Sequence, residues 1–431
     1  MNLHKQILLS RLLTRSGDQA WDFALPVTLV LLFPTSFGLI AALFFATKVG
    51  QFLFQPMLAG VIDRWKRSHT AYFGTLLQLV SVTSAAACLF ALAALQRDTS
   101  TLNLSTLEFL LIVGITIASV GSTLGSGLMD IAIGNDWIPT LVAPEELAQV
   151  NSRLKQIDLA TEVLSPVIAG LLLGISASTF PLLGFSLIVT WNVASFFPEM
   201  MLLRNVFRSS KSLHSIVTLQ TKGSQSLLRK TFNGWKEFWR HPSAAVMVAY
   251  AFLWLSALSP HGVLLTSFLK GGWQLSEFTL GLFRGSGALF GLLATLMFPP
   301  IVKRFGLHRG SLLFILLQAL ALILALPFFY FRSLDGLVFL VLLLVSRIGL
   351  YGFSMGEMEI RQRTIGAGQR GLINGVASAL TGFATLTLYG AGTLVGGHEQ
   401  FSWMVVLSVS SVCVGALVYL QWFQRNSRDS H

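Results

Sequence analysis

Long runs of apolar residues recur along the whole chain and restrict it to one environment. Each run has about 20 residues or more, the length of a helix that crosses a lipid bilayer. Only 11% of the residues are charged, against roughly 25% in soluble domains. The sequence therefore predicts an all-α membrane protein and excludes a soluble domain. We expect twelve transmembrane helices, near residues 7–33, 37–62, 69–95, 105–134, 146–175, 179–204, 243–269, 276–301, 308–331, 336–356, 371–396 and 401–423.

The basic residues show which side of the membrane the loops face. Most of the 30 Lys and Arg residues lie at the two chain ends and in the loops that follow the even-numbered spans. Basic loops stay in the cytoplasm, so both termini are expected there. Topology thus accounts for the net charge of +11, and no nucleic-acid partner is inferred. We expect a multi-pass protein of the plasma membrane, the inner membrane if the source is bacterial, surrounded by lipid.

A long polar connection divides the expected spans into two sets of six. We predict an N-terminal lobe at residues 1–204, a cytoplasmic linker with an amphipathic interfacial helix at 205–241, and a C-terminal lobe at 242–431. A weak repeat supports the division, because Asp63-Arg64-Trp65-Lys66-Arg67 follows span two and Val302-Lys303-Arg304 follows span eight. This six-plus-six pattern resembles the major facilitator fold, whose members work by alternating access.

Two carboxylates in the first span are candidate ion ligands. Asp18 and Asp22 are four residues apart and share a helix face if the segment is helical. Two such carboxylates repel unless a cation or a proton lies between them. Ser16 and Gly17 could break the helix and release backbone carbonyls as further ligands. The structural alternative is an ion pair between Asp18 and Arg15 near the helix end.

Span six carries a polar stripe on one helix face. Asn192, Ser195, Phe196 and Glu199 recur at helical spacing. The amide, hydroxyl and carboxylate suit the oxygen shell of a cation, whereas hydrogen bonding between helices explains them equally well. Gln78 in span three is another isolated polar residue.

Span seven is expected to be broken at Pro260-His261-Gly262. Proline removes an amide and clashes with the preceding turn, and glycine loosens the next one. Transporters place ion sites at discontinuous helices, and imidazole suits metals such as Fe, Ni, Co and Zn. A satisfied buried histidine is the alternative to a metal ligand.

Charged residues gather at the cytoplasmic ends of the spans. Some contact solvent or lipid headgroups in the simplest interpretation. Acidic and basic ends from opposite lobes could instead pair to close the cytoplasmic side, as a gate. The candidates for this gate are Asp63, Arg67, Asp136, Asp158, Glu162 and Arg370.

Several motifs together resemble one transporter family, the ferroportins, and most closely its bacterial members. They cover nearly the whole chain: residues 15–23 (RSGDQAWDF), 135–138 (NDWI), 153–162, 191–199 (WNVASFFPE), 346–350 (SRIGL) and 370–375 (RGLING). The resemblance implies an exporter of Fe²⁺ that also accepts Co²⁺, Ni²⁺ or Mn²⁺, in exchange for protons. It implies neither an enzyme nor a prosthetic group.

The resemblance also implies particular ligands. The first-lobe metal site would comprise Asp18, Thr14, Asn192, Ser195 and Phe196, and the second-lobe site His261. A Ca²⁺ role described for animal members would use Asp18, Gln78, Asn192 and Glu199, with Asp22 as a further possible calcium or secondary metal ligand. Animal members have other residues where this sequence has Asp22, Gly262 and Leu388, so their second-lobe site does not transfer whole.

Two other functions remain open at this stage. A facilitator of organic cations would stack its substrate on aromatic residues and use the acidic residues only for charge. A membrane protein that binds calcium without transport would need only the first-lobe oxygens. No hydrolase triad or phosphate loop is present, and we expect a monomer.

Overall fold

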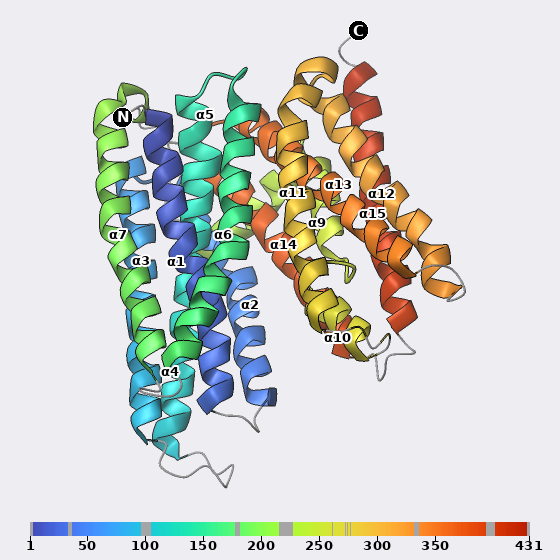
Figure 1. Ribbon diagram of the computed structural model, residues 1–431. Helices are drawn as coiled ribbons and strands as arrows, with labels where there is room; N and C mark the ends of the chain where they lie inside the picture. Colours follow the sequence, from blue (N-terminus) through green and yellow to red (C-terminus); the bar gives the residue numbers. More distant parts are fainter. Residues whose placement is uncertain are drawn as a thin grey trace. The chain divides into compact units, whose positions relative to one another are not determined.

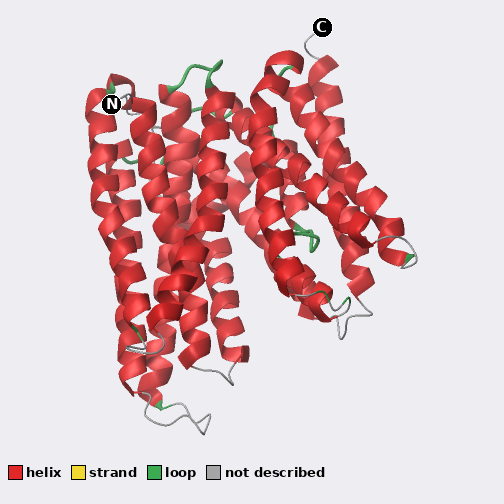
Figure 2. Ribbon diagram, viewed as in Figure 1, coloured by secondary structure: helices red, strands yellow, loops and turns green. Residues whose placement is uncertain are grey.

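The structure is a computed structural model, and helices joined by loops make up the part of the chain that it describes (Figures 1 and 2). That part comprises residues 3–32, 37–95, 105–176, 182–214, 227–260, 262–271, 273, 275, 277–331, 336–393 and 401–428, and it contains no strand. The expectation of an all-α fold is confirmed.

The helices follow the order of the apolar runs. Eleven of the twelve expected spans coincide with one long helix each, and α9 and α10 together occupy the seventh. The elements are α1 (Leu3–Leu32), α2 (Phe37–Ala59), α3 (Arg67–Leu95), α4 (Thr106–Met129), the π-helix η1 (Asp130–Trp137), α5 (Ile138–Leu141), α6 (Leu147–Ser176), α7 (Leu183–Ser209), the 3₁₀ helix η2 (Lys211–His214), α8 (Leu227–Arg240), α9 (Ala244–Trp254), α10 (Val263–Gly271), α11 (Glu277–Phe305), α12 (Leu307–Tyr330), α13 (Gly336–Thr364), α14 (Arg370–Thr393) and α15 (Phe401–Arg428).

Nine helices among the described residues are long and apolar enough to cross a membrane. α1 is not one of them, because five charged residues lie along it. Within this group, α3 packs against α4 and also contacts α7. α7 in turn packs along α1 (Figure 1). A polar helix such as α1 is tolerated in a membrane where its charges face protein rather than lipid.

The chain packs into two compact units, and the boundaries between them fall within three helices, α6, α8 and α14. The first unit contains Met1–Leu141, Ala160–Phe232 and Ala367–Ser378, and the second contains Val142–Leu159, Asn233–Gly366 and Ala379–His431. The beginning of α6 therefore packs within the second unit, and the beginning of α14 within the first. The lobe boundaries predicted from the sequence stay a prediction. A lobe is a group of helices that moves as one body, whereas these units are defined by packing alone.

Glycines allow close helix crossings in each unit. In the second unit, Gly349, Gly352 and Gly356 follow one face of α13, and a methyl group at any of them would clash with α12. In the first unit, Gly125 of α4 leaves only 3.0 Å between its missing Cβ and the backbone of α3. Small residues at such crossings increase packing contacts, which hold helices together in lipid.

Candidate functional site

Asp18 is the centre of a buried polar cluster in the first unit. Its side chain is only 8% exposed. The Gln78 amide on α3 donates a hydrogen bond to one carboxylate oxygen, and the Ser126 hydroxyl on α4 donates to the other at 3.1 Å. α1 continues through Ser16 and Gly17 without interruption, so a helix break at that point is wrong.

α7 brings its polar stripe directly against α1. A Cβ on Gly17 would lie 3.2 Å from both the Asn192 amide nitrogen and the Ser195 hydroxyl, so this glycine lets the two helices approach beside Asp18. Asn192 is fully buried, and the Ser195 hydroxyl donates to its backbone carbonyl at 2.7 Å. The predicted first-lobe residues of spans one and six therefore do lie together.

Several polar atoms around Asp18 are buried without a partner in the described part of the chain. They are both side-chain atoms of the Asn192 amide, the Gln78 carbonyl oxygen and one carboxylate oxygen of Glu199. Leaving such a group unsatisfied costs about 1–3 kcal/mol, so unpaired oxygens gathered near a buried carboxylate need an explanation. A bound cation would satisfy the oxygens, because hard cations take carboxylate, amide and hydroxyl ligands.

The remaining first-lobe candidates occupy different environments. Thr14, one turn before Asp18, donates its hydroxyl to the Ser10 carbonyl at 2.9 Å, and Phe196 is buried. Asp22, one turn after Asp18, is exposed and so does not share its burial. The described residues contain no group of three or more His, Cys, Asp or Glu placed to hold a metal. Amides and hydroxyls would therefore supply most of the ligands at Asp18.

The π-helix η1 carries two aspartates that each bind two arginines. Asp130, at its start, pairs with Arg11 and Arg15 of α1, the second at 2.5 Å. Arg15 is thus engaged by Asp130, a partner that the sequence analysis missed because nothing in the spacing links α1 to span four. π-Turns within α-helices occur often at functional sites.

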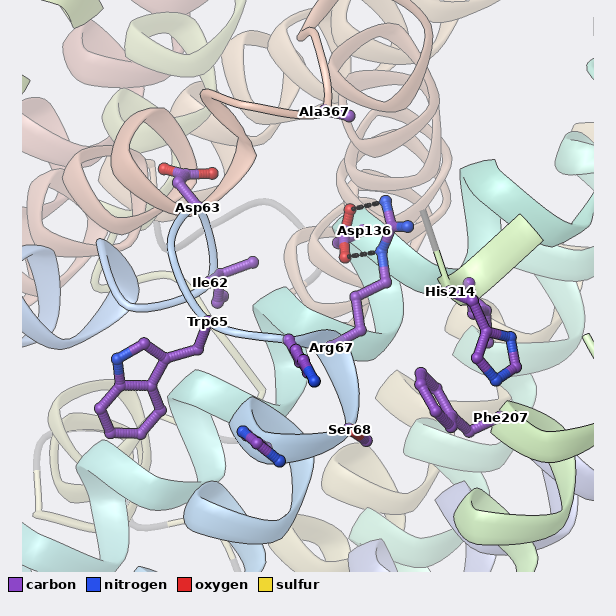
Figure 3. A pocket seen from close by; sticks show the side chains of 12 residues that line it. Ile62, Asp63, Trp65, Arg67, Ser68, Asp136, Phe207, His214 and Ala367 are labelled. Atoms are coloured by element: carbon purple, nitrogen blue, oxygen red, sulfur yellow. Dashed lines mark hydrogen bonds and ion pairs between the residues drawn. The ribbon is translucent and has the colours of Figure 1, made fainter. Parts of the chain in front are cut away.

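Asp136, near the end of η1, is the more buried of the two aspartates. Arg67 donates to it from Nε at 2.6 Å and from Nη2 at 3.0 Å (Figure 3). Arg370, the first residue of α14, donates to the carboxylate at 3.1 Å and to the Asp136 backbone carbonyl at 2.9 Å. Three of the predicted gate residues therefore form one ion-pair cluster in the first unit.

Asp63 caps the beginning of α14. Its carboxylate accepts hydrogen bonds from the backbone amides of Gly371 at 2.8 Å and Leu372 at 2.7 Å, which would otherwise be unpaired at the helix start. Burial raises the pKa of Asp63 to about 7; Asp136 adds to the rise, and the amide bonds and Arg64 oppose it. A cavity of 320 Å³, lined by both aspartates and by Arg67, lies beside the cap (Figure 3).

The other two gate candidates lie one turn apart on α6. Asp158 belongs to the stretch of α6 in the second unit, and Glu162 to the stretch in the first. Both are partly buried. Their part in a gate stays a prediction.

The break in span seven is present, and it is longer than expected. α9 ends at Trp254 and α10 begins at Val263, so helical geometry is lost well before Pro260. Side chains from other helices hold the intervening backbone: Ser408 binds the Ala257 amide at 2.8 Å, and Arg347 donates to the Leu258 carbonyl at 3.2 Å. His261 lies outside the described residues, so its role as a ligand stays a prediction.

The fold defines the class of protein. The chain matches a proton:xylose symporter of the major facilitator superfamily with a TM-score of 0.68 at 14% identity, over 97% of this chain and 95% of that one. At this identity the match establishes the fold alone. The protein is a multi-pass membrane protein with the major facilitator fold, the architecture of secondary transporters.

Closer relatives identify the family. The model of the family Ferroportin1 (FPN1) matches residues 2–412. A protein named Ferreportin from Bdellovibrio bacteriovorus is 40% identical over 99% of this chain and 96% of its own length. Human Ferroportin is 23% identical over 97% of this chain and 90% of its own length. The chain therefore belongs to the ferroportin family, whose members are transporters rather than enzymes.

Solved structures agree with this assignment. A bacterial homologue of the iron transporter ferroportin, crystallised in an outward-facing state, matches with a TM-score of 0.89 at 40% identity, over 98% of this chain and 99% of that one. A structure of a bacterial homologue of the iron transporter ferroportin in an outward-facing state with soaked iron matches with a TM-score of 0.87. The identity is again 40%, and the match covers 98% of this chain and 99% of that one.

Proposed function

We propose that this protein exports a divalent transition metal, Fe²⁺ or a similar ion such as Co²⁺, Ni²⁺ or Mn²⁺, by alternating access. The observation that carries the proposal is the group of unpaired buried oxygens around Asp18. Iron was soaked into a structure of a 40% identical homologue, which supports iron as the substrate. We further propose a monomer in the plasma membrane with both termini in the cytoplasm.

Asp18 would supply the charge that attracts the metal. Asn192, Gln78 and Ser195 would supply neutral oxygens, with the second carboxylate from Glu199 nearby. Such an all-oxygen shell binds borderline metals less tightly than imidazole or thiolate ligands do, which suits a site that must also release its ion. The same shell is compatible with Ca²⁺, so calcium is the competitor to test.

Proton exchange would follow from ligand chemistry. A carboxylate or an imidazole must lose its proton before it binds a metal, so metal entry releases protons and protonation releases the metal. Asp18 would provide this linkage in the first lobe, and His261 in the second.

The gate would operate at the beginning of α14. Asp136 and Asp63 together hold Arg370, Gly371 and Leu372 within the first unit. Access to the metal from the cytoplasm would require these contacts to break, because α14 continues from the first unit into the second.

Metal flux into proteoliposomes tests the function. An internal dye that Co²⁺ or Fe²⁺ quenches reports metal entry, and a second dye reports internal pH. We expect metal entry coupled to opposite proton movement, strongly reduced in Asp18→Asn and in Asn192→Ala. The matched controls are Lys5→Gln, an exposed position on the same helix as Asp18, and Asn205→Ala, an exposed position on the same helix as Asn192.

Other outcomes would replace the proposal. Wild-type protein that folds but carries no metal, and that transports aromatic cations instead, would identify a facilitator of organic cations. Calcium binding that depends on Asp18, without any metal flux, would identify a calcium-binding protein without transport activity.

A further inference from the structure

A large cavity lies in the second unit, away from the cluster around Asp18. It encloses about 790 Å³ between the beginning of α6, the end of α11 and the end of α13. It is lined by Glu145, Ala148, Gln149, Ser152, Arg153, Gln156, Thr295, Leu296, Pro299, Pro300, Val302, Lys303 and Arg363. None of these residues belongs to the metal site or to the gate proposed above.

The rim of this cavity is basic. Arg153 of α6 and Lys303 of α11 are exposed, and neither forms an ion pair within the described ranges of the chain. Arg363 of α13 is held by Glu359 at 2.6 Å and donates to the Pro144 carbonyl at 2.7 Å. Glu145 is the one acidic residue in the lining, so the described rim keeps an excess of positive charge.

The wall of the cavity is apolar along α11. Leu296, Pro299 and Pro300 line it, and the Leu296 side chain is 65% exposed. Leu296 precedes Lys303 by seven residues, which places it about 10 Å further along the helix axis. α11 is one of the helices apolar enough to cross the membrane, so this direction leads from the membrane surface into the bilayer. A soluble anion would bind to the basic residues of the rim and would make no use of the apolar wall. A ligand that fits both has an anionic group and an apolar part.

We propose that the cavity binds one anionic phospholipid. Its phosphate would lie between Arg153 and Lys303, and an acyl chain would follow Leu296 and the two prolines. Basic pockets between transmembrane helices on the cytoplasmic side bind such headgroups. The lipid would bridge α6 and α11 and so fasten the stretch of α6 that packs in the second unit, where Ser152 already contacts the Thr295 carbonyl.

Lipid retention by the intact protein tests the proposal. Detergent-solubilised protein is titrated with phosphatidylglycerol or phosphatidylcholine, and the first bound lipid is counted by native mass spectrometry. The key variant is Arg153→Gln/Lys303→Gln, which changes exposed side chains and should leave the fold intact. Arg304→Gln is the matched control, because Arg304 is the next exposed cation on α11 and does not line the cavity.

We expect phosphatidylglycerol to bind more tightly than phosphatidylcholine. Each lost cation near the membrane surface should weaken binding about fivefold, hence roughly 25-fold in the double variant, with little change in Arg304→Gln. Equal affinity for the two lipids, or a double variant that retains phosphatidylglycerol like the wild type, would overturn the proposal. Displacement of the lipid by an equal concentration of glycerol phosphate would overturn it too, because the ligand would then be a soluble anion.

Discussion

Replacement of Asp136 by asparagine should release the beginning of α14. The Asp136 side chain is 4% exposed, and it accepts bonds from the arginines Arg67 and Arg370, whose side chains are 8% and 11% exposed. Removing one partner from a buried ion pair costs about 3–5 kcal/mol, because the remaining charges stay buried without compensation. We take about 3 kcal/mol, since asparagine keeps one oxygen acceptor and Arg370 keeps its bond to the backbone carbonyl.

A free-energy cost of this size should raise the fraction of molecules in which the beginning of α14 has detached by about a hundredfold. Hydrogen–deuterium exchange measures it directly, since the amides of Gly371 and Leu372 are bonded to Asp63 and become exchangeable only when the helix start detaches. The peptide that covers residues 366–378 should lose protection by the same factor.

The matched control lies on the same π-helix. Asp130 also binds two arginines, but both are on α1, and the Asp130 side chain is 37% exposed. Asp130→Asn should therefore leave the α14 amides protected. Unchanged exchange in Asp136→Asn, or equal exchange in the two variants, would refute the reasoning that Asp136 anchors α14.

Three further predictions concern separate features. The pKa of Asp63 is about 7 in the folded protein and 3.8 ordinarily, so the folded form binds more protons than the detached form near pH 7. Lowering the pH from about 8 to about 6 should therefore increase the hydrogen-exchange protection of the beginning of α14, by at most about 1.4 kcal/mol per pH unit. Asp63→Asn should abolish this pH dependence. Gly352→Val should lower the thermal unfolding midpoint through overpacking of about 1–3 kcal/mol, whereas Gly285→Val, where a Cβ meets nothing, should not. Arg347→Met should remove the charged hydrogen-bond donor that holds the Leu258 carbonyl, a bond worth about 1.5–3 kcal/mol, and so increase hydrogen exchange in the break of span seven. Arg284→Met, at an exposed arginine, is the control. An equal increase of exchange in the break in both variants would contradict the prediction.

The fold was predictable because a bilayer leaves little choice. Apolar runs of sufficient length must become helices in lipid, and their boundaries can be read from the sequence. The break in span seven was predictable from Pro260, but its extent was not. Proline clashes with the carbonyl four residues earlier, which carries the disruption back to Ser256, and the partners that hold the backbone come from distant helices.

The site was only partly predictable. The stripe of Asn192 and Ser195 follows from helical spacing, and the structure places it beside Asp18. The bonds from Gln78 and Ser126 to Asp18 connect three helices, and no spacing rule predicts them. The π-helix that carries Asp130 was also missed, since eight residues of wider helix leave no periodic pattern in the sequence.

α6 and α14 are rigid rods anchored in two bodies at once. At about 1.5 Å per residue, the 24 residues of α14 span about 36 Å, and only its beginning packs in the first unit. A continuous helix resists bending far more than a loop does, so it cannot act as a slack tether between the units. In the proposed gate, the short end would therefore detach as a rigid piece, and the strength of its contacts with Asp136 and Asp63 would set how often the transporter can complete a cycle.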